Sequence, residues 1–179
     1  MAAKMPPPRP AGVPTSYVMQ PLKIKLQYRG KSWLTILMEV GHDELDDTVD
    51  PPLRLPDDLR DLVVALGFPA PQPIPVLAVE HQVAQKLHAS SEPGSEQAHD
   101  LVDLQLLARE PDFDRARTVD VCRRLFVFRK KHTWPPDITV NANWTTLYAT
   151  AAEGLEVAPD VESAARWGNE FVAQLDRQR

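Results

Sequence analysis

Four charged side chains have the types and the spacing to do chemistry: Glu39, Lys86, Asp100 and Asp103. Glu39 follows a run of bulky apolar residues, where a carboxylate is costly unless a partner neutralises it. Such a residue is either a strand-end charge that reaches solvent or a carboxylate that binds a metal ion on a sheet. Spacing alone does not separate the two readings.

Lys86 lies in a segment with helical periodicity, in which Val79, Val83 and Leu87 would face the core. The lysine sits beside this apolar stripe. A lysine in such a position is either a surface side chain whose stem lies along apolar neighbours or a ligand for an anion. The first reading is favoured by spacing alone.

Asp100 and Asp103 are three residues apart and would be neighbours on one helix face. Two close carboxylates repel, so they require a cation, a hydrogen-bond donor or a raised pKa. One alternative is that Asp100 benefits from the N-terminus of a helix capped by Ser95. Another is a metal site in which His99 and Asp103 pair at helical i, i+4 spacing, joined by a further histidine, but no cysteine cluster or HExxH pattern supports zinc.

The elements that position these residues predict an α+β fold. Alternation from Leu22 to Tyr28, a turn at Arg29–Ser32 and a bulky run over Trp33–Val40 predict a small antiparallel hairpin with a more buried second strand. A short helix near 57–66 follows. A helical half is then predicted, with helices near 79–90, 96–109, 114–132 and 160–177, the last capped by Asp160, and a short helix between 133 and 159.

Composition and length predict one domain and a tail. Residues 1–16 hold five prolines and few large apolar side chains, which predicts a disordered tail. Residues 17–179 are expected to form a single domain, with sheet over 17–79 and helices over 80–179. The net charge of −5 does not indicate broad electrostatic binding of nucleic acid. A basic cluster within 123–132 is either a local nucleic-acid patch or, as charge patterning favours, a solvated helix face.

Cysteine usage and hydropathy bear on location. The single cysteine, Cys122, lies in a helical apolar pattern and is expected to be buried and without an internal disulfide partner. This usage favours a reducing compartment. No apolar run approaches the roughly 18 residues that span a bilayer. A cytoplasmic protein without membrane partners is therefore expected.

The segment from Glu80 to Ala89, followed by His99-Asp100-Leu-Val-Asp103-Leu, resembles the helical half of the AbiEii family of nucleotidyltransferases. These are toxin components of bacterial type IV toxin–antitoxin and abortive-infection systems. The resemblance extends from about Leu22 to about Lys131 and includes the hairpin and the strand that ends in Glu39. It implies a fold like a truncated polymerase β-like nucleotidyltransferase.

The resemblance also implies roles for individual residues. In such enzymes a Gly-Ser motif cradles the nucleoside triphosphate (NTP), and three carboxylates bind magnesium (Mg2+). Glu39 matches the third of these metal carboxylates, and Lys86 matches a lysine thought to contact the nucleotide phosphates. Asp100 and Asp103 match a basic-Asp-x-x-Asp element, with His99 where lysine is commoner. The implied catalytic set is Glu39, Lys86 and Asp100, and the implied nucleotide-binding set is Lys86, Asp100 and Asp103.

One departure from the family pattern matters for activity. The sole Gly-Ser pair, Gly94-Ser95, comes after the hairpin, so no Gly-Ser and Asp-x-Asp arrangement precedes the strand that ends in Glu39. Two metal carboxylates and the phosphate cradle are therefore missing, and a two-metal site cannot be assembled from these residues. Two functions follow as hypotheses. The chain is part of a toxin that transfers a nucleotide from an NTP to an RNA or protein acceptor, or it is a catalytically dead relative that binds a cognate antitoxin, RNA or nucleotide.

Overall fold

The computed structural model describes residues 2–6, 19–41, 43–46 and 50–177 and shows an α+β fold, as predicted. The chain divides into two compact units, residues 1–47 and 48–179. This division follows the sequence physically, because the hairpin pairs with its own neighbouring strand and an acidic, proline-containing stretch separates it from the next element. The single domain expected over 17–179 stays a prediction.

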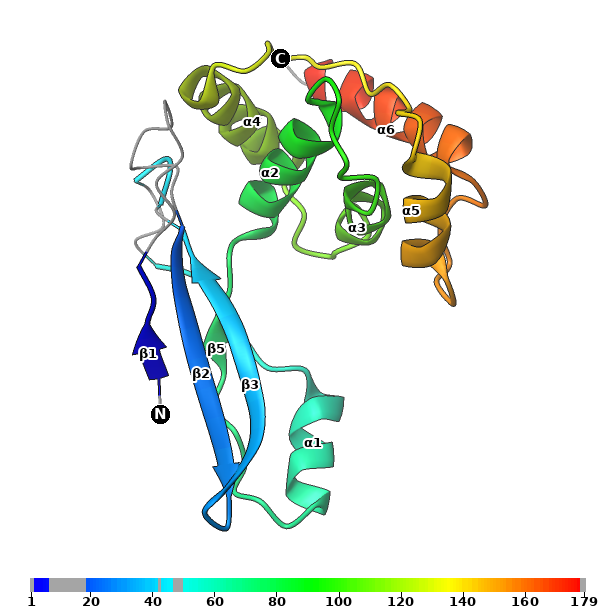
Figure 1. Cartoon of the computed structure of the whole chain (residues 1–179). Coiled ribbons are helices and arrows are strands. Elements are labelled where there is room, and N and C mark those ends of the chain that lie inside the picture. Colours follow the sequence, from blue (N-terminus) through cyan, green and yellow to red (C-terminus); the bar gives the residue numbers. More distant parts are fainter. Residues whose placement is uncertain (1, 7–18, 42, 47–49, 178–179) are drawn as a thin grey trace. The chain divides into compact units, whose positions relative to one another are not determined.

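The first unit is a three-stranded antiparallel sheet in the order β1 (Ala2–Lys4), β2 (Gln20–Tyr28) and β3 (Lys31–Val40). Figure 1 shows β2 and β3 as one long hairpin. The tight turn places Arg29 and Gly30 at φ 49° and 76°, the left-handed region that two-residue hairpin turns require. The predicted hairpin is confirmed.

Two expectations for this unit do not hold. β3 is exposed at all ten positions instead of being the more buried strand, because a bulky run becomes buried only where another layer covers it. Ala2–Lys4 pair with Leu22–Ile24 in an edge strand instead of belonging to a tail, since backbone pairing needs no large side chains. Residues 7–16 of the predicted tail lie outside the described residues.

The second unit begins with a short ribbon and a helix. β4 (Leu53–Arg54) pairs with β5 (Ile74–Pro75), and α1 (Asp57–Ala65) lies between them in the chain (Figure 1). α1 starts with the predicted acidic turn, and Gly67 at φ 82° follows its end as predicted. The helix buries none of its residues.

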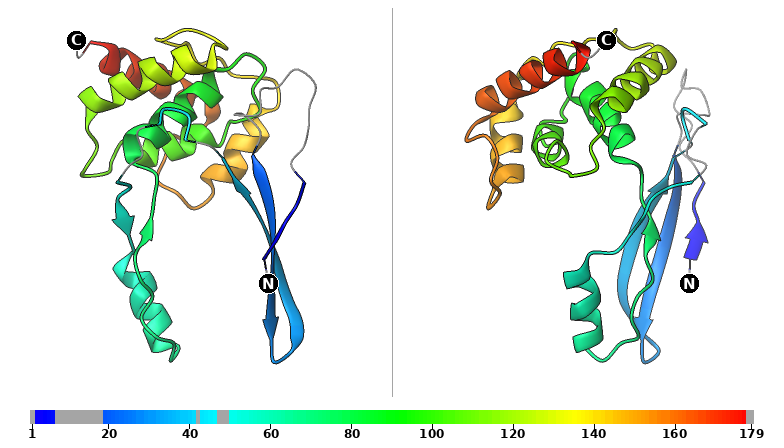
Figure 2. Two further views of the ribbon diagram at one scale, coloured as in Figure 1. Left: turned by 90° about the vertical axis from the view of Figure 1, so that its left-hand side faces the viewer. Right: turned by 180° about the vertical axis from the view of Figure 1, so that it is seen from behind.

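The helices α2 (Val79–Ser91), α3 (Asp100–Leu107), α4 (Arg115–Arg129), α5 (Trp144–Ala152) and α6 (Val161–Asp176) form one cluster. α2 packs against α3 and α4, and α6 packs against α3, α4 and α5 (Figure 2). The core between them includes fully buried Leu87, Leu101, Trp144 and Leu175, and Cys122 is buried as expected. Within the described residues, none of the helices has both the length and the apolar content to cross a bilayer.

The helix ends show where sequence patterns succeed. Asp160 caps α6 as predicted, its carboxylate accepting from the Ser163 amide at 2.7 Å. Ser95 does not cap α3, which begins at Asp100 instead of near 96. The Ser95 carbonyl accepts from the buried Trp144 indole at 2.7 Å and from Asn141 at 2.9 Å. This tertiary anchor keeps residue 95 in a loop, and α3 is therefore shorter than its periodicity suggested.

Candidate functional site

Lys86, Asp100 and Asp103 meet in a polar cluster between α2 and α3. The Lys86 ammonium nitrogen Nζ lies 2.9 Å from Asp100 Oδ1 and 2.5 Å from Asp103 Oδ2. The Asp100 side chain is 8% exposed, whereas those of Lys86 and Asp103 are 25% and 42% exposed. The Asp100 end of the cluster is therefore buried in the core, and the Asp103 end is exposed to solvent.

The local sequence explains this meeting. Val83 and Leu87 are buried against the other helices and fix the rotation of α2, so that Lys86 is carried to the flank that faces α3. Asp100 and Asp103 both lie in the first turn of α3, where carboxylates are favoured by the positive end of the helix dipole. The sequence analysis predicted that only Asp100 lies near the helix start, because it predicted this helix to begin near residue 96 instead of at Asp100.

The cluster's electrostatics are asymmetric. Burial alone would lower the pKa of Lys86, but hydrogen bonds to Asp103 and Asp100, with their charges, outweigh it and raise that pKa. Burial raises the pKa of Asp100, and the hydrogen bond and charge of Lys86 oppose this shift without cancelling it. Lys86 is therefore a firmly protonated cation at neutral pH, held by one core carboxylate and one half-exposed carboxylate.

The arrangement has groups that can bind a sugar phosphate. An ammonium group has three N–H donors, and two of them are used by the aspartates. A third donor can serve a phosphate oxygen, and the carboxylates can accept from sugar hydroxyls. Fully ionised, the three groups carry one net negative charge, so a phosphate gains most where it replaces Asp103 as a partner of Lys86.

Glu39 belongs to the other unit. It lies on β3 opposite Pro21, and its side chain is exposed. Its side chain makes no hydrogen bond or ion pair with the described residues. The structure thus brings together Lys86, Asp100 and Asp103, whereas a role for Glu39 beside them stays a prediction.

The described residues do not form a magnesium site. No group of three metal-binding side chains occurs among them, and the oxygens of Asp100 and Asp103 nearest to Lys86 already bind its ammonium. Mg2+ prefers six oxygen ligands in near-ideal octahedral geometry, so Glu39 alone cannot hold it. The zinc alternative has no support either, because His99 is 53% exposed with its Nε2 3.6 Å from Asp100.

Sequence reasoning missed a pair of histidines, buried His88 and partly exposed His132, at the edge of the core. The rings of His88 and His132 lie 4.5 Å apart, and both contact Phe126. The Ser91 hydroxyl lies 2.7 Å from His132 Nε2 and donates to the Leu87 carbonyl, which makes it a structural link instead of an activated nucleophile. No local signal could reveal this pair, because its members are far apart in the sequence.

The basic cluster within 123–132 is largely neutralised by neighbours. Arg123 pairs with Asp176 at 3.3 Å, Arg124 with Asp120 at 3.4 Å, and Lys131 with Glu92 at 3.4 Å. These exposed ion pairs support the reading of a solvated helix face. The nucleic-acid reading of this cluster gains no support from them.

Residues 9–176 match the family model described as nucleotidyl transferase AbiEii toxin, type IV TA system. The match covers both units and reaches beyond the segment on which the sequence resemblance rested. No curated protein matches the chain.

Proposed function

The chain belongs to the AbiEii family of nucleotidyltransferase toxins of type IV toxin–antitoxin systems, and from this premise we propose that it binds an NTP whose nucleotide is transferred to an RNA or protein acceptor. In such a transfer an acceptor oxygen bonds to the α-phosphorus and pyrophosphate leaves. The helical unit contributes the binding of the triphosphate.

One observation carries the proposal: the Lys86 ammonium is held between Asp100 and Asp103 at the open edge of α2 and α3. Asp100 is the positioning partner, because it is buried and fixes the ammonium. Asp103 is half-exposed and is the partner that a phosphate oxygen replaces. Charge-assisted hydrogen bonds of this kind are the strong ones in anion recognition.

Glu39 and magnesium complete the proposal only as expectations. The family is one of nucleotidyltransferases, which typically depend on a metal ion. Glu39 offers one carboxylate, and further oxygen ligands would have to come from the triphosphate and from groups outside the described residues. No step of the reaction is derived through the metal ion.

A second function is favoured by the sequence, in which the only Gly-Ser pair comes after the hairpin and no Gly-Ser and Asp-x-Asp arrangement comes before it. In this alternative the chain binds a nucleotide, an RNA or its cognate antitoxin without catalysing transfer. The nucleotide-binding role of Lys86 is the same in both functions. Binding and transfer must therefore be measured separately.

Calorimetric titration with NTPs tests the shared step. Lys86→Gln should weaken triphosphate binding about tenfold or more, the effect of losing one charge-assisted hydrogen bond. Lys31→Gln is the matched control, because Lys31 is an exposed lysine on β3. Lys86→Arg keeps the charge and should retain part of the affinity. Unchanged affinity in a folded Lys86→Gln variant would contradict the proposal.

A transfer assay separates the two functions. The chain is incubated with labelled NTPs, magnesium and total RNA, and the label in RNA and in protein is followed. Triphosphate binding without labelling supports the binding module, because the missing cradle and carboxylates supply electrostatic stabilisation that Glu39 cannot replace. Labelling that disappears in Glu39→Ala supports the enzyme and places Glu39 in its site.

A further inference from the structure

A cavity lies in the helical unit, apart from the Lys86 cluster. It has a volume of about 430 Å³ and is lined by α6, the C-terminal end of α3, the first residue of α4 and Ala158. Lys86, Asp100 and Asp103 are not among its lining residues. This volume falls within the range of roughly 300–1,000 Å³ typical of small-molecule sites.

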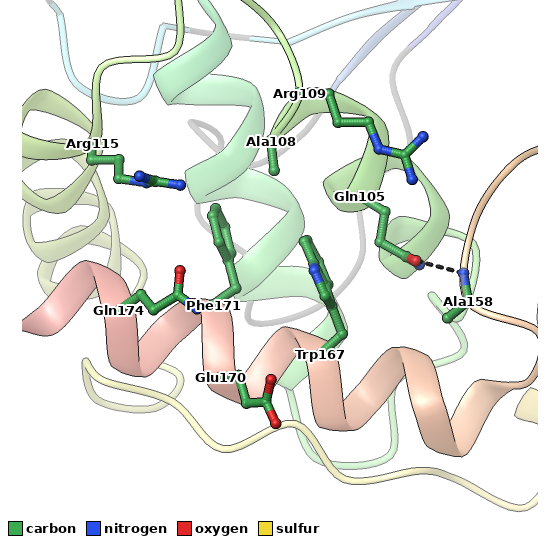
Figure 3. A pocket seen from close by; sticks show the side chains of 9 residues that line it. All are labelled: Gln105, Ala108, Arg109, Arg115, Ala158, Trp167, Glu170, Phe171 and Gln174. Atoms are coloured by element: carbon green, nitrogen blue, oxygen red, sulfur yellow. Dashed lines mark hydrogen bonds between the residues drawn. The ribbon is translucent and has the colours of Figure 1, made fainter.

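An aromatic pair forms one wall of the cavity. Trp167 and Phe171, one turn apart on α6, stack with ring centroids 5.1 Å apart and an angle of 10° between planes. Figure 3 shows both rings rising from α6 toward the end of α3. Phe171 is buried, whereas Trp167 is partly exposed. The indole is therefore held rigidly by its neighbour while part of its surface faces the cavity, as in platforms that stack planar bases.

Two guanidinium groups flank the aromatic pair from opposite sides, Arg115 from α4 and Arg109 from the end of α3 (Figure 3). Arg109 donates to the Glu156 carbonyl at 2.6 Å, which fixes its side chain. Neither arginine pairs with a carboxylate of the described residues, and Arg115 makes no side-chain hydrogen bond there. Guanidinium groups match phosphate oxygens in charge and in geometry.

The remaining polar groups suit a ligand with a polar edge. Gln174 lies beside Phe171 and offers both a donor and an acceptor. Gln105 is already engaged, since it donates to Leu101 and Tyr148 and accepts from the Ala158 amide at 2.7 Å. Gln105 thus fixes the side of the cavity formed by Ala158. Glu170 is the acidic residue of the lining, so the two arginines leave the cavity positive.

We propose that this cavity binds a nucleotide unit, with its base against Trp167 and its phosphate at Arg115, while Arg109, which already donates to the Glu156 carbonyl, adds positive charge. An aromatic wall without cations would suit any apolar group, and paired cations without the wall would suit any anion. The combination selects a compound that carries both a planar ring and a phosphate. Such a unit is either a free nucleotide or the phosphorylated end of an RNA chain. The site is independent of the transfer reaction and of Lys86.

Equilibrium dialysis of the full chain tests the site with three probes: AMP and GMP, inorganic phosphate, and a 5′-phosphorylated RNA tetranucleotide. Binding of the nucleotides or the tetranucleotide is expected to be saturable and at least about tenfold tighter than that of phosphate, because stacking adds to the ionic contact. If only the tetranucleotide binds, the site is assigned to RNA ends. If AMP or GMP binds as well as the tetranucleotide, the site is assigned to free nucleotides. The proposal would be overturned if phosphate bound as tightly as the nucleotides and the tetranucleotide. It would also be overturned if neither the nucleotides nor the tetranucleotide showed saturable binding.

Variants locate the binding. Arg115→Ala and Trp167→Leu should each weaken it about tenfold, the scale of one ionic or stacking contact. Arg117→Ala is the matched control, since Arg117 is an exposed arginine of α4 outside the cavity lining, and it should bind as the parent chain does. Loss in Lys86→Gln with retention in Arg115→Ala would overturn the proposal, because the ligand would then occupy the Lys86 cluster.

Discussion

Two tryptophans show how differently the two units use apolar residues. Trp144 on α5 is 0% exposed, and its indole donates to the Ser95 carbonyl, whereas Trp33 on β3 is 73% exposed. The helices α2–α6 enclose their own core. The hairpin presents large apolar side chains that the described residues leave uncovered. Stability is therefore expected to reside mainly in the helical cluster, where the Lys86 site is also built.

The sharpest test of this comparison is a pair of truncations. Trp144→Ala should destabilise the chain by about 3–5 kcal/mol, because it leaves a cavity in the core and removes one of the two donors to the Ser95 carbonyl. Trp33→Ala should change the unfolding free energy by no more than about 0.5 kcal/mol, as expected for an exposed residue. Urea unfolding followed by circular dichroism measures both. Equal losses in the two variants would show that β3 is covered in solution.

The core of the helical unit should also respond to acid through His88. Burial, with the charges of Arg129, His132 and Lys131, lowers the pKa of His88 to about 3. In the unfolded chain the same group titrates near 6.5, so between these values the unfolded state binds more protons. Stability should therefore fall as the pH drops from about 6.5 toward 3, by about 2–4 kcal/mol from this group.

His88→Leu isolates this contribution. The substitution removes the titrating ring but keeps an apolar side chain beside Phe126, and the variant should lose less stability between pH 7 and pH 4 than the parent chain. The comparison rests on the difference in slope of unfolding free energy against pH. Parallel curves for the two proteins would mean that His88 is protonated in the folded state, contrary to its buried position.

Breaking the polar cluster should have a smaller effect. Lys86→Met leaves the buried Asp100 carboxylate without its cation, at a cost of about 1–3 kcal/mol at pH 7. Because the folded pKa of Lys86 is raised, its stabilising contribution is complete below the unfolded pKa of 10.5 and is lost as the pH rises through the folded value. Thermal melts at pH 7 and above pH 11 should show the parent and variant converging. If the difference in melting temperature between parent and variant stayed the same at both pH values, the stabilisation would not come from the charge of Lys86.

The sequence predicted the elements better than their environment. Alternation and turn residues located the hairpin, and the cap at Asp160 located α6, because these signals act within a few residues. The exposure of β3 and the anchoring of Ser95 by Trp144 depend on distant contacts, and local patterns do not contain them. Lys86, Asp100 and Asp103 were predicted as site residues, but the ammonium between the carboxylates was not, because it required the packing of α2 against α3.

The aromatic and arginine cavity shows the same limit in a different way. Trp167 and Phe171 are four apart on one helix and were detectable as a pair, yet that spacing is equally typical of a core-facing stripe. Arg109 and Arg115 belong to different segments, and only the packing of α6 against α3 and α4 brings them to the rings. A binding role for this cavity can therefore be inferred only from the packed structure and not from the sequence.

The smallest expected effect concerns the edge of the hairpin. Deleting residues 1–6 removes β1 with its backbone pairing to β2, and also removes Met5, which bonds through its backbone to Gln20 and Pro21. The freed groups of β2 can bind water, so each lost hydrogen bond costs little, and the melting temperature should shift by no more than about 2 °C. Trp144→Ala provides the large reference shift under the same conditions. A comparable shift on deletion would mean that this unit, and not the helical cluster, limits the stability of the chain.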